Sequence, residues 1–209
     1  MILASRLYAQ APPARTNWEF TAAKGSTLTT ASVGIVASTP VLLKHARFGI
    51  GVRGTFATGD RKLTPAGAKN VPAGVVDTLH ASARALMFNI SGHVSALVTR
   101  RLEAGMNIDL VGLGTGGSRE SRYRASAAAT PVTVDASPAT TNVFLYGSKD
   151  RGSLNSEFFV AWRATDRLTI RGGLSHQLVE YKATRVLTSN TDRFRQYSNL
   201  AVIGLRVAR

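Results

Sequence analysis

Cysteine is absent from the 209 residues, so the chain can form neither a disulfide nor a thiolate metal site. The chain also lacks any run of 18 or more apolar residues, which excludes a transmembrane helix. The lack of long apolar runs does not exclude a membrane-spanning β-barrel, because a strand crosses a bilayer with only about 9–11 residues. Export cannot be inferred from the missing thiols.

Acidic residues are scarce: 12 Asp and Glu stand against 26 Lys and Arg, which gives a net charge of +14. Such an excess has three common explanations, namely nucleic-acid binding, attraction to an anionic membrane surface, or cationic loops. The positions of the charges along the chain must decide between them.

Metal and nucleotide motifs are also missing. His45, His80 and His176 lie on separate segments without metal-ligand spacing, and no HExxH or EF-hand pattern is present. The glycine pairs at 116–117 and 172–173 do not build a phosphate-binding loop. We therefore expect neither a metal nor a cofactor.

The first residues, MILASRLYAQAPPAR, have a short apolar start and an A-x-A-like cleavage site at Ala9-Gln10-Ala11. We interpret residues 1–15 as the remnant of a signal peptide, with a disordered N-terminus as the alternative. Residues 16–209 then form a single domain.

Strict alternation of apolar and polar residues is the dominant pattern in the chain. In LEAGMNIDLVGLG, residues 102–114, Leu102, Met106 and Ile108 alternate with polar positions such as Glu103 and Asp109. Period-two alternation indicates a strand with unlike faces. The sequence therefore predicts an all-β protein of about eight strands, at residues 16–24, 28–41, 46–58, 78–98, 101–114, 153–164, 167–184 and 192–208.

The predicted connections alternate in length. Short turns fall at about 40–44, 99–101 and 165–167, while long polar links fall at about 58–77 and 114–152, with a shorter one near 185–191. An antiparallel up-and-down arrangement places all the short turns at one end and all the long links at the other. Outer-membrane barrels have this layout, with short periplasmic turns and longer external loops.

The polar faces of these strands contain no lysine in their interior, although a solvated face usually carries Lys and Glu in quantity. Charges withdrawn from water are expected to pair, and here four carboxylates accompany five guanidinium groups. We predict an ion-pair network inside a closed antiparallel transmembrane β-barrel, made of Glu19, Arg47, Arg53, Glu103, Asp109, Glu157, Arg163, Arg171 and Arg206.

The apolar faces then face lipid. The predicted lipid-facing residues are Phe48, Ile50, Val52, Leu86, Phe88, Ile90, Leu102, Met106, Ile108, Leu110, Phe158, Val160, Trp162, Ile170, Leu174, Ile203 and Leu205. The alternative is a soluble, secreted lipocalin-like carrier, in which the apolar faces would surround a ligand instead.

Most of the remaining positive charge lies in the long links and at nearby strand ends. A basic rim there suits anionic lipid headgroups, such as the phosphates of lipopolysaccharide, although an ordinary solvated loop surface would look the same. Nucleic acid is disfavoured, because no basic groove with interleaved aromatic residues is visible. The predicted rim comprises Arg61, Lys62, Lys69, Arg119, Arg122, Arg124, Lys149, Arg151, Arg185, Arg193 and Arg195.

One group of polar residues has the composition of a hydrolase site. His93 and Ser95 share a strand face, and a tight turn with about three residues would place Glu103 opposite Ser95. Such a set could act as base, nucleophile and orienting group. It is similar to the H-x-S pair of outer-membrane lipid A deacylases, but parity places these three residues in the lumen, so a hydrogen-bond network is the preferred interpretation.

The segments RGSLNSEFFVAW, RLTIRGGLSHQL and SNLAVIGLRVAR resemble strands of eight-stranded bacterial outer-membrane barrels of the OmpA/OmpX-like type. The resemblance covers nearly the whole chain. It implies location in the bacterial outer membrane, insertion by the barrel-assembly machinery, and a lumen too full of side chains for a wide pore. The family usually ends in an aromatic residue, whereas this chain ends in Val207-Ala208-Arg209.

The expected function is therefore that of a non-enzymatic, porin-like membrane protein of the cell envelope. Its role would be structural or in surface interaction, and at most small solutes would pass slowly through it. The lipocalin-like carrier and, less favoured, the lipid A deacylase remain the alternatives.

Overall fold

The computed structural model describes residues 15–41, 46–66, 77–125, 130–187 and 190–209. The predicted signal-peptide remnant lies outside the described residues except for Arg15, which is already the first residue of a strand. Among the described residues, no helix has the length and hydrophobicity to cross a bilayer.

Eleven strands and one short 3-10 helix make up the described chain. They are β1 Arg15–Lys24, β2 Thr29–Pro40, β3 Ala46–Pro65, β4 Thr78–Leu97, β5 Leu102–Thr115, β6 Arg119–Arg124, β7 Val132–Pro138, β8 Thr141–Val143, η1 Gly147–Lys149, β9 Leu154–Arg163, β10 Leu168–Ala183 and β11 Arg193–Ala208.

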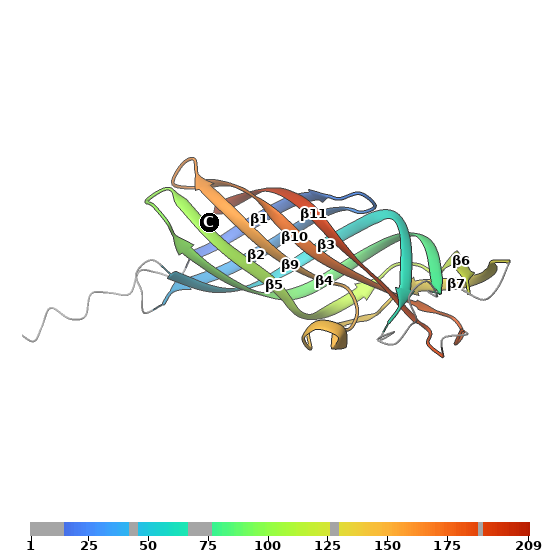
Figure 1. Ribbon diagram of the computed structural model, residues 1–209. Helices are drawn as coiled ribbons and strands as arrows, with labels where there is room; N and C mark the ends of the chain where they lie inside the picture. The colour runs from blue at the N-terminus through green and yellow to red at the C-terminus, as the bar shows by residue number, and fades with distance from the viewer. Residues whose placement is uncertain (1–14, 42–45, 67–76, 126–129, 188–189) are drawn as a thin grey trace, which may run out of the picture.

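Eight of these strands form a closed antiparallel ring in up-and-down order (Figure 1). The successive pairs are β1–β2, β2–β3, β3–β4, β4–β5, β5–β9, β9–β10 and β10–β11, and β11 returns to pair with β1. Trp18 opposite Val207 and Lys24 opposite Ala201 mark the closing register. The total number of strands predicted from the sequence is wrong by three, because β6, β7 and β8 form within the link predicted at 114–152.

Two tight turns share a local cause. In Thr99-Arg100-Arg101-Leu102 the Thr99 hydroxyl accepts hydrogen bonds from the amides of Arg101 and Leu102. Thr165 does the same for the amides of Arg167 and Leu168. These turns and both described chain ends, residues 15 and 209, lie at one end of the barrel, called here the tight-turn end; the opposite end is the loop end.

The extra strands extend the barrel beyond the loop end. β6 pairs with β4 and with β7, and β7 pairs with β10. β11 also pairs with the far end of β3, through Phe194 opposite Pro65. β3, β4, β6, β7, β10 and β11 therefore close a second, six-stranded ring, which projects from the main barrel in Figure 1.

The interior has two layers. Charged and polar side chains fill the part near the tight-turn end, whereas apolar side chains fill the loop end and the six-stranded ring. The apolar core cluster consists of Ala23, Leu28, Ala57, Leu63, Leu79, Ala81, Met87, Tyr123, Val134, Ala136, Val179, Tyr181, Ala183, Phe194, Leu200 and Val202.

Candidate functional site

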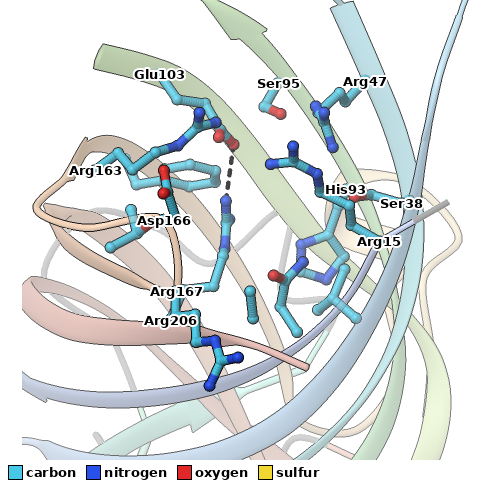
Figure 2. Close-up of a pocket in the computed structure, with 16 residues that line it drawn as sticks. Arg15, Ser38, Arg47, His93, Ser95, Glu103, Arg163, Asp166, Arg167 and Arg206 are labelled. Atoms are coloured by element: carbon cyan, nitrogen blue, oxygen red, sulfur yellow. Dashed lines mark hydrogen bonds and ion pairs between the residues drawn. The ribbon is translucent and has the colours of Figure 1, made fainter. Parts of the chain in front are cut away.

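A continuous chain of ion pairs runs through the polar layer of the lumen. It begins near the tight-turn end, where Arg206 Nη1 lies 2.9 Å from Glu103 Oε1 (Figure 2) and Arg206 Nε lies 2.8 Å from Glu19 Oε1. Since Glu103 is on β5 and Glu19 on β1, Arg206 of β11 connects strands on different sides of the barrel.

Arg171 and Arg53 continue the chain inward. Arg171 Nη1 lies 3.0 Å from Glu19 Oε2, and its Nη2 lies 2.9 Å from Glu157 Oε2. Glu157 Oε2 also lies 3.8 Å from Arg53 Nη1, and Arg53 Nη2 forms a short ion pair with Asp109. The charges alternate in sign along the whole chain, as isolated buried charges would otherwise be very costly.

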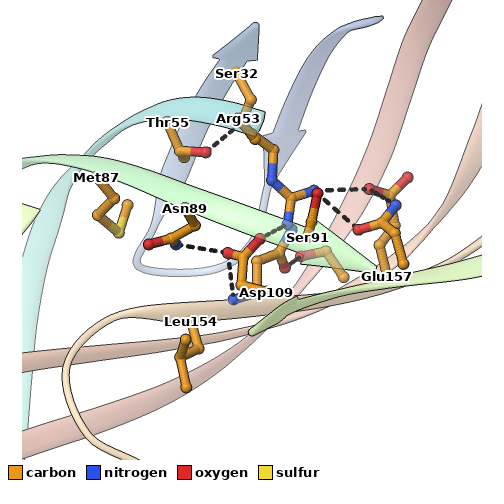
Figure 3. Close-up of polar contacts among 12 residues, drawn as sticks. Ser32, Arg53, Thr55, Met87, Asn89, Ser91, Asp109, Leu154 and Glu157 are labelled. Carbon is orange, nitrogen blue, oxygen red and sulfur yellow. Dashed lines mark hydrogen bonds and ion pairs between the residues drawn. The ribbon is translucent and has the colours of Figure 1, made fainter. Parts of the chain in front are cut away.

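Amide side chains complete the inner end of this chain (Figure 3). Asn107 accepts a hydrogen bond from Arg53 Nη1 at 2.9 Å and donates to Glu157 Oε2 at 3.2 Å. Asn89 donates to Asp109 Oδ2 at 2.7 Å. Because the amides share the carboxylates with the guanidinium groups, the network is stabilised by charge-assisted hydrogen bonds as well as by charge.

Phe159 is an aromatic member of the lumen that sequence reasoning missed. The guanidinium carbons of Arg171 and Arg206 lie 5.1 Å and 5.5 Å from its ring centroid, within cation–π range. Gly105 makes room for the ring, because a Cβ there would lie 2.7 Å from Phe159 Cζ. The sequence contains a signal for this position, because residue 159 is odd-numbered like the polar, lumen-facing residues of LNSEFFVAWRA.

Two of the nine predicted network residues do not join it. Arg47 and Arg163 are half-buried and form no ion pair or side-chain hydrogen bond within the described parts of the chain. Both lie at the tight-turn end, where the carboxylate that faces them from the lumen, Glu103, is already bound to Arg206. The predicted nine-member network is thus corrected to seven members.

The His93, Ser95 and Glu103 set is not arranged as a catalytic triad. His93 Nε2 lies 2.9 Å from the Ser91 hydroxyl rather than from Ser95, and Glu103 binds Arg206. The predicted pairing of Glu103 with Ser95 is wrong: Ser95 lies opposite Gly105, and Glu103 opposite Leu97. The described residues include no group of three or more His, Asp or Glu side chains that could hold a metal.

The seventeen residues predicted to face lipid all lie on the outer surface of the barrel. Fourteen are exposed, with Leu174, Ile203 and Phe158 at 67%, 65% and 64%, and Leu102, Met106 and Ile108 are half-buried. On β3 this surface extends from Phe48 to Phe56. Trp18 and Trp162 are exposed near the tight-turn end, and Tyr197 near the other end.

A β-bulge interrupts the alternation on β5. Ile90 pairs with Val111 and Ser91 with Asp109, so Leu110 is the extra residue. Leu110 and Val111 are therefore both exposed, and beyond them the outward positions become odd-numbered, as the 65% exposure of Leu113 shows.

Only part of the predicted basic rim is exposed and available for a partner. Glu180, which is 2% exposed, binds Arg193 at 2.8 Å and Arg195 at 3.3 Å. These two arginines therefore belong to a second buried ion-pair group rather than to a surface rim. Lys69 lies outside the described residues, as does the side chain of Arg61, and the exposed rim residues are Lys62, Arg119, Arg122, Arg124, Lys149, Arg151 and Arg185.

No protein-family model and no curated protein sequence matches the chain. Solved structures similar to it include the Neisserial surface protein A, at 12% identity and a TM-score of 0.41, covering 93% of this chain and 94% of that one. A major outer membrane protein from Thermus thermophilus is 11% identical with a TM-score of 0.44, covering 94% and 99%. The N-terminal β-barrel domain of Pseudomonas aeruginosa OprF is 8% identical with a TM-score of 0.41, covering 93% and 97%. Identities of this size say nothing about a shared activity.

Proposed function

We propose that the protein is an integral barrel of the bacterial outer membrane, with a structural or surface-interaction role and no enzymatic activity. The observation that carries the proposal is the continuous apolar outer surface of the eight-stranded ring. Soluble monomers rarely expose apolar patches above a few hundred Å², and in lipid a strand can span only as part of a closed barrel, where all its backbone groups are paired.

The inverted distribution of polarity favours this function over a lipocalin-like carrier. A carrier would need an apolar cavity open to a ligand and a solvated outer face. Here the lumen near the tight-turn end holds the ion-pair chain, and the apolar core at the loop end is filled by its own side chains, with Leu63, Leu79 and Phe194 at 0% exposure.

The seven exposed cations of the loop end support a role in contacting anionic groups at the cell surface. Guanidinium groups bind phosphate through paired, charge-assisted hydrogen bonds, so lipopolysaccharide phosphates are the proposed partners. Recognition by the barrel-assembly machinery is also proposed, although the chain ends in Val207-Ala208-Arg209.

Membrane fractionation tests the central proposal. The protein should stay in the membrane pellet after carbonate washing and should need detergent for extraction, and the folded barrel should migrate differently from the boiled protein on a gel. Release by carbonate without detergent would overturn the proposal.

Vesicle binding tests the surface role. With the barrel reconstituted in zwitterionic lipid, Arg122→Gln/Arg124→Gln should weaken its capture of lipopolysaccharide micelles. Arg100→Gln/Arg101→Gln, in a tight turn at the other end, is the matched control and should leave capture unchanged. Equal loss in both variants would reject a specific role of the loop end.

A further inference from the structure

A cavity opens at the tight-turn end of the lumen, where Asp166 and Arg167 of the turn that contains Thr165 line it. Strand ends from all around the barrel line it, and Figure 2 shows Arg15, Arg47, Arg163, Arg167 and Arg206 among its lining residues. The ion-pair chain closes its inner side, because Arg206 and Glu103 belong to both.

The cavity has an unbalanced positive charge. Five arginines line it, and the acidic lining residues are Glu103 and Asp166, so its lining carries a net charge of about +3 if the histidine is neutral. Arg15, Arg47 and Arg163 form no ion pair with any described residue. Arg47 experiences repulsion from Arg15, Arg163 and Arg206, and attraction from Glu103.

One of the residues that line the cavity also has a buried polar atom without a partner among the described residues. His93 lines the cavity and is 7% exposed, and its Nδ1 is buried without a hydrogen bond from any described residue. When the Ser91 hydroxyl donates to His93 Nε2, the ring hydrogen is on Nδ1 and needs an acceptor. Unsatisfied buried donors are rare in folded proteins and call for a ligand or water.

The size of the cavity limits what can satisfy these donors. Its volume is about 40 Å³, and one water-sized group needs roughly 10–15 Å³. Three or four such groups would therefore fit, which matches the oxygens of a single oxyanion.

We propose that this cavity is a binding site for one small oxyanion of the phosphate class, held by Arg47, Arg163 and Arg15. The site lies at the end opposite the exposed cations of the loop end and would face the periplasm. The oxyanion is either free phosphate or the phosphate of a lipid headgroup, since the same donors recognise both.

Calorimetric titration of the purified barrel in detergent with inorganic phosphate, at constant ionic strength, tests the site. Loss of one charge-assisted hydrogen bond lowers affinity about tenfold, so Arg47→Gln/Arg163→Gln should bind phosphate at least about tenfold more weakly. Arg100→Gln/Arg101→Gln, which removes two charges at the same end of the barrel but outside the cavity lining, is the matched control and should bind as the unmodified protein does.

A variant with the opposite expected sign removes ambiguity from misfolding. Glu103→Gln deletes the carboxylate that competes with the anion, so phosphate affinity should rise. Absence of phosphate binding by the unmodified protein, or equal affinity in all three variants, would overturn the proposal.

Glycerol phosphate distinguishes the two sources of the oxyanion. Tighter binding of glycerol phosphate than of inorganic phosphate, with the same dependence on Arg47 and Arg163, would assign the site to a lipid headgroup. The reverse order would assign it to the free ion. A failure of the barrel to insert in membranes would concern the outer surface and leave this titration in detergent interpretable.

Discussion

Arg171 is the central residue of the ion-pair chain. It is 2% exposed, binds Glu19 and Glu157, and stacks on Phe159. Gly204 allows this packing, because a Cβ there would lie 3.3 Å from Arg171 Cγ. A buried guanidinium with two carboxylate partners and an aromatic neighbour is held in one orientation, so β1, β9 and β10 are linked across the lumen by one side chain.

Replacing Arg171 should therefore destabilise the barrel strongly. Arg171→Met leaves Glu157 with the 3.8 Å contact to Arg53 and the hydrogen bond from Asn107, and breaking a buried pair on one side costs about 3–5 kcal/mol. Urea unfolding of the barrel in lipid vesicles measures the change. In the double variant Arg171→Met/Glu157→Gln the loss should be smaller than the sum of the two single losses; full additivity would contradict the coupling.

Ser95 gives a second test at the level of single residues. Because the nearest hydroxyl to His93 Nε2 is that of Ser91, at 2.9 Å, Ser95→Ala should leave the acylation state of lipid A unchanged in cells that express the protein. Mass spectrometry of extracted lipid A measures this. A change in acylation upon expression that disappears in Ser95→Ala would restore the deacylase hypothesis.

The sequence predicts which charges turn inward, but not which charges pair. The lumen face is identified by the odd or even position of each residue along its strand and by the absence of lysine. Both can be read within a single strand, without knowledge of its neighbours. Pairing depends on the stagger between strands that are distant in the chain. Arg47 and Arg163 have the correct parity and still miss the network, because Glu103, the lumen carboxylate that lines the same cavity, is bound to Arg206.

The hairpin of β4 and β5 shows the same distinction for a whole element. The predicted pairing placed Glu103 opposite Ser95, whereas the turn Thr99–Arg101, closed by the hydrogen bond from Val98 N to Leu102 O, places Glu103 opposite Leu97. The error amounts to two residues, and a shift by an even number preserves the face on which each side chain lies. Sidedness was therefore predictable although the exact partner was not.

Two adjacent residues of β5 test sidedness directly. Ile108 lies on the apolar outer surface, whereas Asp109 binds Arg53 in the lumen. Ile108→Arg should cost about 2–4 kcal/mol, as arginine does near the middle of a bilayer, and should reduce the heat-modifiable, membrane-inserted fraction. Asp109→Asn should assemble better, because Asn keeps an acceptor for Arg53. The reverse ranking would mean that the barrel faces are inverted.

β6, β7 and β8 were not predictable from alternation alone. β6 and β7 have only 6 and 7 residues and β8 has 3. Their apolar members, such as Tyr123, Val134 and Ala136, are buried in the apolar core together with residues of β10 and β11, such as Tyr181 and Phe194. Only the tertiary contacts make these segments strands, which is the usual limit of reading short strands from sequence.

Removing β6 and β7 should spare the main barrel. The eight-stranded ring is closed by its own pairings, so replacing residues 119–137 with a short Gly-Ser linker should still give a heat-modifiable, membrane-inserted protein. Its unfolding in urea should be easier, because Tyr123 and Val134 leave the apolar core. Replacing only residues 126–129 with the same linker is the control for the linker itself. Complete loss of insertion would show that the six-stranded ring is needed for assembly.

At the scale of the whole molecule, two layers of side chains, one charged and one apolar, block the lumen one after the other along the barrel axis. The ion-pair chain crosses the half near the tight-turn end, and the apolar core, with Leu63, Leu79 and Phe194 at 0% exposure, fills the loop end. A small barrel of eight strands leaves an interior just wide enough for side chains. Narrowing to six strands at the loop end tightens it further, so the slow passage of small solutes expected from the sequence has no support in this packing.

The closed lumen predicts an electrically silent protein. An ion that crosses it must displace the paired charges and then pass a dry apolar core, where transfer of an unpaired ion costs many kcal/mol. Reconstituted into a planar lipid bilayer, the protein should give no steady single-channel current, while a large general porin inserted under the same conditions should conduct. Insertion must be verified separately by the heat-modifiable band of protein recovered from the same lipid. Stable current steps from the unmodified protein, with an amplitude that scales with salt concentration, would show that the lumen opens and would replace the closed barrel with a channel.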